Sequence, residues 1–352
     1  YFKDYTAAFE AFKAGAFPFH EEFFSKIWAT EYGFPAIQKG WVIKEQVPDG
    51  RPSGTQGFWF NMRRPQFQDP RVREALSMAF DFEWSNDTLF YGLYERTTSF
   101  FENAPMKAEG MPSEAELELL EPLRADLPAA VFEEEAYTPP VTDGSGSDRR
   151  VLRRAMKLLD EAGWTVKDGM RVNAEGQPLT LELLDDSPTF ERIIGPMIAN
   201  LRKMGVDAKL RIVDAAQYQQ RQEDFDYDVV PGRFVMSMTP GQELRSLFGL
   251  DAAGQPGTPN LTGLANPAVD ALIEKVIAAD SRESLDAAAR ALDRVLRALH
   301  IWTPNWYKGE YNIAYWDVFG MPENPPPYSR GDGYWWWDQA KYEKLKSEGA
   351  PL

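Results

Sequence analysis

The chain has 352 residues, and 54 Asp and Glu against 38 Lys and Arg give it a formal net charge of −16. Such a charge repels phosphate backbones, which argues against nucleic acid as a partner. Because there is no Cys and only His20 and His300 are present, disulfides, thiolate sites and multi-histidine zinc sites are excluded, and we expect neither a metal nor a cofactor.

The length and a hydrophobic content of 43% are enough for about two domains with a sizeable core. No run approaches the roughly 20 consecutive apolar residues of a membrane span. The first residues, YFKDYTAAFEAFKAGAFPF, show neither the basic nor the apolar region of a signal peptide and begin with an amphipathic segment. We therefore expect the chain to start in the middle of a domain.

The first part of the chain predicts short alternating elements. They are a helix from Asp4 to Ala14, a strand at 17–19, a helix at 21–32 and a strand at 41–46. The segment GFWFNMRR at 57–64 predicts an aromatic strand that ends before Pro65. Asp69 is expected to cap a helix that starts at Pro70 and runs to about Asp81.

Residues 107–148 are rich in Pro, Glu and Gly and predict a surface excursion with one short helix in SEAELELLEPL. Its DGSGSD stretch lacks the G-x-x-x-x-G-K-[ST] pattern, so we interpret it as a linker and not as a phosphate-binding loop.

The next segment alternates between strands and helices. It predicts a helix at 149–162, a strand at 179–184, a helix at 190–204, a strand at 206–213, a short helix at 215–222 and a strand at 225–235 broken at Pro231 and Gly232. This β-α-β-α-β order predicts an α/β domain with both faces of its sheet covered. A loop at 251–260, a helical region at 267–299 split near Ser281, the segment IWTPNWY and a tail with PENPPPY and YWWWD complete the chain.

Four blocks in this order carry a resemblance to a known family. They are AFEAFKAG, FNMRRPQFQDPRVREALSMAFD, AMKLLDEAGW, and NLTGLANPAVDALI followed by TPNWY. Together they cover almost the whole chain and resemble the extracellular solute-binding proteins of family 5, which include dipeptide- and oligopeptide-binding proteins. Within the family, FEWSNDTLFYGLYERTTSFF and RALDRVLR resemble the YejA-like subgroup.

The resemblance implies an α/β, two-lobed periplasmic-binding-protein type II fold. It also implies that the chain is the C-terminal part of such a protein, with the first lobe incomplete because residues before Tyr1 are missing. Residues 1–56 and 311–352 would belong to lobe I, and residues 57–310 would form lobe II. Crossing strands near GFWFN and WYKGEYNIAYW would join the lobes, and the tail tryptophans would pack on lobe I.

The function implied is that of the periplasmic binding component of an ABC importer. It would be a monomer without catalytic activity that encloses an oligopeptide or peptide-conjugate ligand between its lobes by hinge closure and delivers it to membrane permease subunits. The ligand-binding residues implied are Asn61 and Arg63 near the cleft mouth, and Arg233, Phe234, Ser237, Glu243, Asn260 and Trp306 on the wall of lobe II.

One departure from the family concerns the amine of the ligand. Many dipeptide and oligopeptide binders hold the α-amino group with an aspartate that follows a Gly-Trp pair, whereas here Arg233 follows Gly232 and Met236 stands near the place of the acid. Ordinary recognition of a free N-terminus would then need Glu243 or a residue before Tyr1. The wall that carries Arg233 is expected to prefer an anionic or neutral group.

Structural roles are the alternatives at these positions. Arg233 can bind a ligand carboxylate or phosphate, or pair with Asp226 or Asp228. Either Arg63 or its neighbour Arg64 is expected to make a structural ion pair, and Asn61 can cap its strand instead of binding ligand.

Two other functions are alternatives. A carbohydrate-active hydrolase could use Asp185 and Asp186, or Glu133 to Glu135, with aromatic platforms. It needs two facing carboxyl groups about 5 to 9.5 Å apart, whereas neighbours on a strand point apart. A structural or scaffolding protein is the third possibility, and a co-purifying ligand would argue against it.

Overall fold

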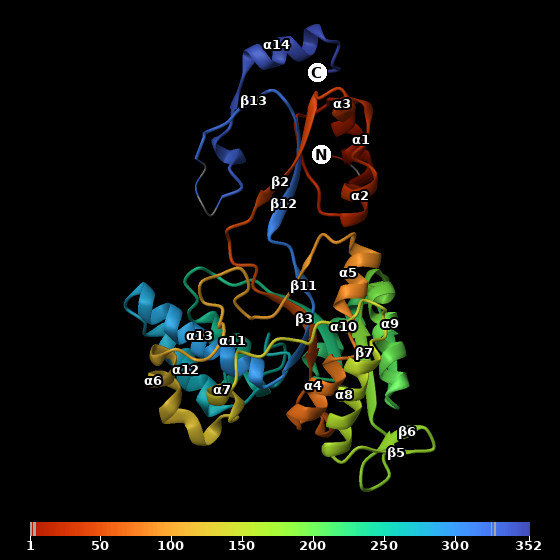
Figure 1. Ribbon diagram of the computed structural model, residues 1–352, viewed down its shortest axis with the longest axis vertical. Helices are drawn as coiled ribbons and strands as arrows, with labels where there is room; N and C mark the ends of the chain where they lie inside the picture. Colours follow the sequence, from red (N-terminus) through yellow and green to blue (C-terminus); the bar gives the residue numbers. More distant parts are fainter. Residues whose placement is uncertain (1, 3–4, 325, 327–328) are drawn as a thin grey trace. The chain divides into compact units, whose positions relative to one another are not determined.

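The computed structural model describes residues 2, 5–324, 326 and 329–352. The chain divides into two compact units (Figure 1), of which unit 1 comprises residues 1–51, 88–94 and 308–352 and unit 2 comprises residues 52–87 and 95–307. The chain therefore leaves unit 1 after Arg51, returns to it for residues 88–94, and returns again at Lys308.

Unit 1 contains an antiparallel sheet in the order β1-β12-β2, formed by β1 (Phe19–Glu21), β12 (Glu310–Trp316) and β2 (Val42–Pro48). Its helices are α1 (Tyr5–Lys13), α2 (Ser25–Thr30), α3 (Pro35–Gln38) and α14 (Gln339–Ser347), and β13 (Phe319–Gly320) pairs with β14 (Trp336–Trp337). Phe9, Phe12, Trp28 and Trp316 are buried in its core. Of the predicted segments, Asp4 and part of PENPPPY lie outside the described residues.

Unit 2 is built on a five-stranded sheet in the order β10-β3-β9-β7-β8. The strands are β3 (Thr55–Phe60), β7 (Thr180–Asp185), β8 (Asp207–Ile212), β9 (Val229–Phe234) and β10 (Trp302–Pro304). β7 runs parallel to β8 and β9, while β3 is antiparallel to β9 and β10. We call the edge where β7, β8, β9 and β10 end the carboxyl edge, and the opposite one the amino edge.

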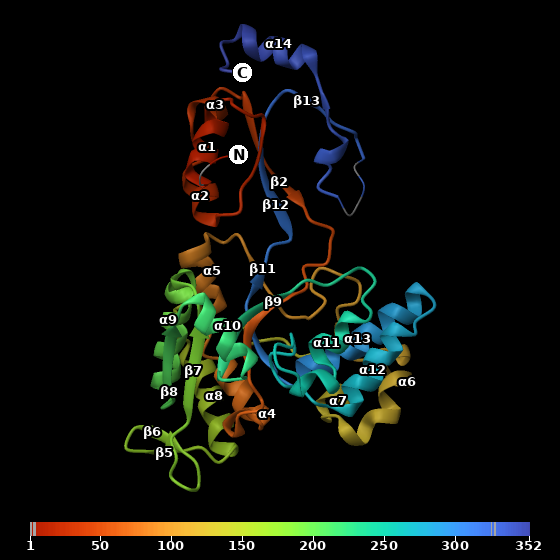
Figure 2. The same ribbon diagram turned by 180° about the vertical axis from the view of Figure 1, so that it is seen from behind.

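Helices cover both faces of this sheet (Figures 1 and 2). On one face lie α4 (Pro70–Ser77), α8 (Arg149–Glu161) and α9 (Glu191–Lys203), and on the other lie α6 (Glu114–Leu120), α7 (Ala130–Glu133), α11 (Glu243–Phe248), α12 (Pro267–Ile277) and α13 (Arg282–Ala298). The remaining elements are α5 (Phe82–Phe90), α10 (Ala215–Glu223), the pair β4 (Glu95–Arg96) and β11 (Trp306–Tyr307), and the pair β5 (Thr165–Lys167) and β6 (Met170–Val172). The predicted α/β domain with two covered faces is confirmed.

Local capping explains several helix boundaries. The Asp69 side chain accepts a hydrogen bond from the Arg71 N–H, and Pro70 occupies the first turn of α4, as expected. The Ser281 side chain caps α13 and separates it from α12, which confirms the predicted split.

The predicted break in the strand at 225–235 is wrong. β9 runs through Pro231 and Gly232, which lie opposite Phe58 and Gly57 of β3. Pro231 lacks the backbone N–H that a strand residue donates to its neighbour. It is tolerated because β9 pairs with β7 only at Val229, so no β7 residue needs that hydrogen bond at Pro231. Gly232 fits because a Cβ at this position would lie 3.0 Å from the Trp59 ring.

Candidate functional site

The structure distributes the predicted ligand-binding residues over two opposite edges of the unit 2 sheet. Asn61, Arg63 and Asn260 lie around the amino edge, whereas Arg233, Phe234 and Trp306 lie at the carboxyl edge and Ser237 and Glu243 follow it in sequence. The two groups therefore do not form one site.

Asn61 follows β3 and is fully buried. Its amide nitrogen donates to the carbonyls of Phe225 and Tyr227 at 3.0 and 2.8 Å, and its amide oxygen accepts from the Arg63 N–H at 3.2 Å. These are the contacts of a strand cap, the structural alternative for this residue, and ligand contact at Asn61 stays a prediction.

The Arg63 guanidinium is also used within the chain. It donates to the carbonyl of Ala253 at 2.6 Å and to that of Asn260 at 3.1 Å, and it lies 3.8 Å above the Phe225 ring. Burial lowers the pKa of Arg63. The ion pair expected for one of the two neighbouring arginines is made by Arg64, with Asp226 at 2.9 Å.

Asn260 holds the loop between α11 and α12. It is fully buried, its amide nitrogen donates to the carbonyls of Gly249 and Leu264, and its amide oxygen accepts from the Thr262 hydroxyl and the Leu264 N–H. Its described contacts stabilise the loop, and ligand contact there stays a prediction.

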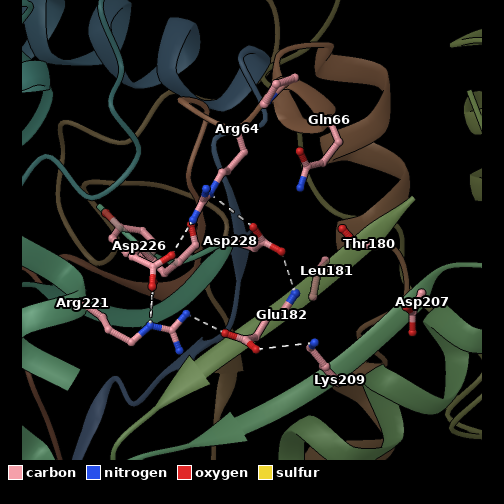
Figure 3. Close-up of a pocket in the computed structure, with 12 residues that line it drawn as sticks. Arg64, Gln66, Thr180, Leu181, Glu182, Asp207, Lys209, Arg221, Asp226 and Asp228 are labelled. Carbon is pink, nitrogen blue, oxygen red and sulfur yellow. Dashed lines mark hydrogen bonds and ion pairs between the residues drawn. The ribbon is translucent and has the colours of Figure 1, made fainter. Parts of the chain in front are cut away.

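An open pocket of about 420 Å³ lies at the amino edge (Figure 3). It is lined by Arg64, Pro65, Gln66, Thr180, Leu181, Glu182, Asp207, Lys209, Arg221, Asp226, Tyr227 and Asp228. Each of its three cations has a carboxylate partner, with Arg64 on Asp226 at 2.9 Å, Arg221 on Glu182 at 2.7 Å and Lys209 on Glu182 at 3.8 Å. The cations that line the pocket are thus all neutralised by carboxylates, and these ion pairs link residues at the starts of the strands.

A second pocket, of about 360 Å³, lies within unit 1 beside the exposed ring of Phe23. Its two arginines are also partnered, since Arg51 pairs with Asp49 at 3.0 Å and Arg330 pairs with Asp332 at 2.6 Å. Neither pocket offers an unpaired cation.

Arg233 at the carboxyl edge differs from all of these arginines. It is exposed, and within the described residues its guanidinium has no hydrogen-bond or ion-pair partner. The predicted alternative, a pair with Asp226 or Asp228, is wrong because both carboxylates precede β9 at the amino edge, where Arg64 contacts them, whereas Arg233 lies near the carboxyl end of that strand. Gln56, which lies directly opposite Arg233 in the sheet, likewise has no partner for its side chain in the part of the chain that the structure describes.

Aromatic rings adjoin this edge. Trp306 is 8% exposed, and its ring centroid lies 6.2 Å from those of Phe80 and Phe190. Phe190 ends the short turn that follows β7. The Phe234 ring instead packs against the Trp59 ring, with their centroids 4.7 Å apart. It lies on the face of the sheet that carries the helical core.

Ser237 and Glu243 are exposed and hold the segment after β9. The Ser237 hydroxyl accepts from the Thr239 N–H at 3.1 Å, and the Glu243 carboxylate accepts from the Gly241 N–H at 3.1 Å. Ligand contact at either residue stays a prediction.

Sequence reasoning missed Gln56 and considered Asp185 only as a hydrolase residue. Asp185 is the last residue of β7, and the residue is 3% exposed. A polar residue at the end of the apolar strand LTLELL was the available signal. Whether this residue lies at a candidate site depends on which strands flank β7. The order of the strands in a sheet cannot be predicted from the local sequence.

Among the described residues, no group of three or more His, Asp or Glu side chains is arranged to hold a metal ion. No helix in the described part of the chain is long and apolar enough to cross a membrane.

A family model described as "Bacterial extracellular solute-binding proteins, family 5 Middle" matches residues 1–255. The chain is 45% identical over 340 residues to a "Probable peptide-binding protein YejA" of Agrobacterium fabrum, a match that covers 96% of this chain and 55% of the relative. It is 41% identical to the "Uncharacterized protein YejA" of Escherichia coli, over 99% of this chain and 57% of the relative. A "Peptidoglycan-binding protein YepA" of Agrobacterium fabrum is 37% identical over 96% of this chain and 56% of its own.

Solved structures share the fold. The oligopeptide-binding protein AppA of Bacillus subtilis, in complex with a nonapeptide, superposes with a TM-score of 0.64 at 16% identity, covering 95% of this chain and 58% of that one. The murein tripeptide-binding protein MppA, in an unliganded open form, gives a TM-score of 0.64 at 18% identity, over 96% and 56% of the two chains. The expected periplasmic-binding-protein type II fold is confirmed. The chain spans about half the length of the curated relatives it matches.

Proposed function

This chain belongs to the bacterial extracellular solute-binding proteins of family 5 and is YejA-like, and from that premise we propose that it binds an oligopeptide or peptide-like ligand at the carboxyl edge of the unit 2 sheet. The whole protein would act in the periplasm, as a monomer, and deliver the ligand to the membrane permease subunits of an ABC importer. Residues 1–56 and 311–352 would serve as lobe I and residues 57–310 as lobe II, with closure by a hinge. The two compact units of the structure instead have bounds at 51/52 and 307/308 and give residues 88–94 to unit 1.

The observation that carries this proposal is the unpartnered guanidinium of Arg233. Every cation in the amino-edge pocket already has a carboxylate, so an anionic ligand group would have to compete with an existing ion pair there. Arg233 has no such competitor among the residues that the structure describes, and a guanidinium binds a carboxylate through paired hydrogen bonds. Gln56 beside it adds an amide donor and acceptor, and the Trp306 ring adds apolar contact area.

The arrangement of the carboxylates favours binding over hydrolysis. Asp185 is buried, and its carboxylate accepts from the Asp186 N–H at 2.8 Å, whereas the Asp186 side chain is exposed. The two carboxyl groups therefore lie in different surroundings and do not form the facing pair of a glycosidase. We propose that the chain has no catalytic activity.

The names of the relatives support peptides as the ligand class. One is named as a probable peptide-binding protein and another as a peptidoglycan-binding protein. Peptide fragments of peptidoglycan are therefore the second candidate within the same class, since both ligands carry peptide amides and a terminal carboxylate that Gln56 and Arg233 can bind.

Mass spectrometry of material extracted from the purified full-length protein tests this proposal. We expect masses of short peptides or peptide conjugates, in reduced amount from the Arg233→Ala variant. Extracts that contain sugars without amino acids would contradict the peptide assignment. Peptide yields that are equal for wild type and Arg233→Ala would contradict the proposed place of binding.

A further inference from the structure

The chain reverses direction across the unit 2 sheet at the carboxyl edge. β7 leads into α9, which packs with α4 and α8, since Asn200 of α9 donates to the carbonyl of Ala79 at 3.1 Å. β8 leads into α10, whose Tyr218 packs against the helical core on the opposite face. Adjacent strands whose connections diverge to opposite faces create a crevice outside their carboxyl ends, and open α/β sheets bind ligands in such crevices.

Asp185 stands at this point of divergence. It is the last residue of β7 and pairs with Ile212, the last residue of β8. One oxygen of its carboxylate accepts from the N–H groups of Asp186 and Ser187 at 2.8 and 3.2 Å. The other oxygen, Oδ2, is buried and has no hydrogen-bond partner among the described residues. Buried polar atoms in native proteins nearly always have a partner, so this oxygen needs an explanation.

The surroundings of the Asp185 carboxyl group are negatively charged. Burial raises the pKa of the Asp185 carboxyl, and the neighbouring charge of Asp186 adds to the effect. The charges of both carboxylates also contribute to the raised pKa of Tyr218, after burial. No described cation pairs with Asp185, so the site has negative charge that a ligand cation would relieve.

The sheet register relates Asp185 to Arg233. Leu183 of β7 lies beside Val229 of β9, and side chains two residues apart on a strand share a face. Asp185 and Arg233 therefore belong to the same face of the carboxyl edge, one acidic and one basic, without an ion pair between them.

We propose that the Asp185 carboxylate binds a cationic donor of the ligand, the α-ammonium group of a peptide, while Arg233 binds an anionic group. This inference rests on the proposed function and assigns to Asp185 the amine-binding role for which Met236 lacks the chemistry. Glu243 is not needed for that role. Its carboxylate already accepts from Gly241 in an exposed turn.

The test is calorimetry of the full-length protein with tetraalanine and N-acetyl-tetraalanine. We expect N-acetylation to weaken binding to the wild type by roughly ten- to a hundredfold, because a charge-assisted hydrogen bond is lost. Asp185→Asn keeps the acceptor oxygen for Asp186 and Ser187 while removing the charge, and should weaken tetraalanine by a similar factor but leave N-acetyl-tetraalanine unchanged. Asp186→Asn, the matched control, removes an exposed charge next to Asp185 and should change neither peptide by more than about twofold.

Two results would overturn the inference alone. One is a wild type that binds both peptides equally, and the other is an Asp185→Asn variant that loses both peptides equally, which would indicate a structural role. The first is measured on the wild type and does not depend on how well any variant folds. A wild type that binds neither peptide would instead overturn the proposed function and this inference together.

Discussion

Charged side chains in unit 2 differ mainly in whether another residue already neutralises them. Arg64, Arg221 and Lys209 form ion pairs with carboxylates around the amino-edge pocket (Figure 3). These three cations are therefore already neutralised and are not available to an anionic ligand group. In the part of the chain that the structure describes, the Arg233 guanidinium has no hydrogen-bond or ion-pair partner, and one carboxylate oxygen of Asp185 has no hydrogen-bond partner. Residue identity alone does not separate these cases, because only the folded chain determines which charges meet.

His300 gives a prediction at this scale. Its ring lies edge-on to Tyr137 at 4.4 Å, and burial, aided by the charges of Arg73 and Arg154, lowers its pKa to about 3. The Glu74 carboxylate is 3.8 Å away, but burial raises the pKa of Glu74 as well, so it offsets little of this effect. An unfolded His has a pKa of about 6.5. Between these values the unfolded chain binds a proton that the folded chain does not, so the free energy of unfolding falls as the pH falls below about 6.5.

The variant His300→Asn should lose this dependence, and Asn tolerates the left-handed backbone at φ 49°. Between pH 7.5 and pH 5, the free energy of unfolding should fall by about 2 kcal/mol more for the wild type than for the variant. Urea unfolding at the two pH values measures the difference. Equal losses in the two proteins would mean that His300 is protonated in the folded state.

At the scale of elements, the start of β3 is fitted tightly to the end of β9. Gly54 has φ +65°, and a Cβ on it would lie 2.0 Å from the carbonyl oxygen of Phe234 and 2.8 Å from the N–H nitrogen of Met236. The position therefore needs glycine both for its backbone conformation and for the close approach of the two chains.

Gly54→Ala should therefore destabilise unit 2 more than an alanine at an open glycine. Gly163 is the matched control, since it has φ +88° and nothing within 4 Å of its Cβ position. Gly163→Ala should lower the free energy of unfolding by about 1–2 kcal/mol, from backbone strain alone. Gly54→Ala should lower it by at least about twice as much, since the β9 backbone must also shift. Equal losses in urea unfolding would show that β3 and β9 are not packed as described.

The success of sequence reasoning at this scale followed the range of the interactions. The cap at Asp69 and the split of the helical region at Ser281 depend on neighbours within three residues, and the cap and the split were both predicted. The continuity of β9 through Pro231 and Gly232 depends on pairing with β3 and on the Trp59 ring, more than 170 residues away along the chain, and the prediction failed there.

The same division holds for the candidate site. Trp306 could be selected because its segment carries the resemblance to the family, and Arg233 because its segment departs from the family's pattern; the structure has both at the carboxyl edge. Asn61 and Asn260 were selected on the same basis, yet both are fully buried and hydrogen-bonded within the chain. Local sequence does not reveal the burial of Asn61, because the carbonyls that its amide satisfies lie more than 160 residues away. The carbonyls that Asn260 satisfies lie within 11 residues, but its burial depends on how the loop folds.

At the scale of the whole molecule, the chain passes between its two units after Arg51, on either side of residues 88–94, and before Lys308. In unit 2 the first and the last of these passages lie next to the carboxyl edge, since β3 starts at Thr55 and β11 ends at Tyr307. A ligand bound at this edge would therefore lie next to two of the connecting segments, whose movement the proposed hinge closure requires. The proposed hinge closure thus depends on the ligand binding at this edge.

The central claim, that the ligand occupies the carboxyl edge and not the amino-edge pocket, is tested most directly by comparing two arginine variants. The measurement is calorimetry of tetraalanine binding to the full-length protein, its Arg233→Ala variant and its Arg64→Ala variant. We expect Arg233→Ala to weaken binding by roughly ten- to a hundredfold, as loss of a charge-assisted bond requires, and Arg64→Ala to leave affinity within about twofold of wild type. Weakened binding in Arg64→Ala together with unchanged binding in Arg233→Ala would contradict the account and place the ligand at the amino edge.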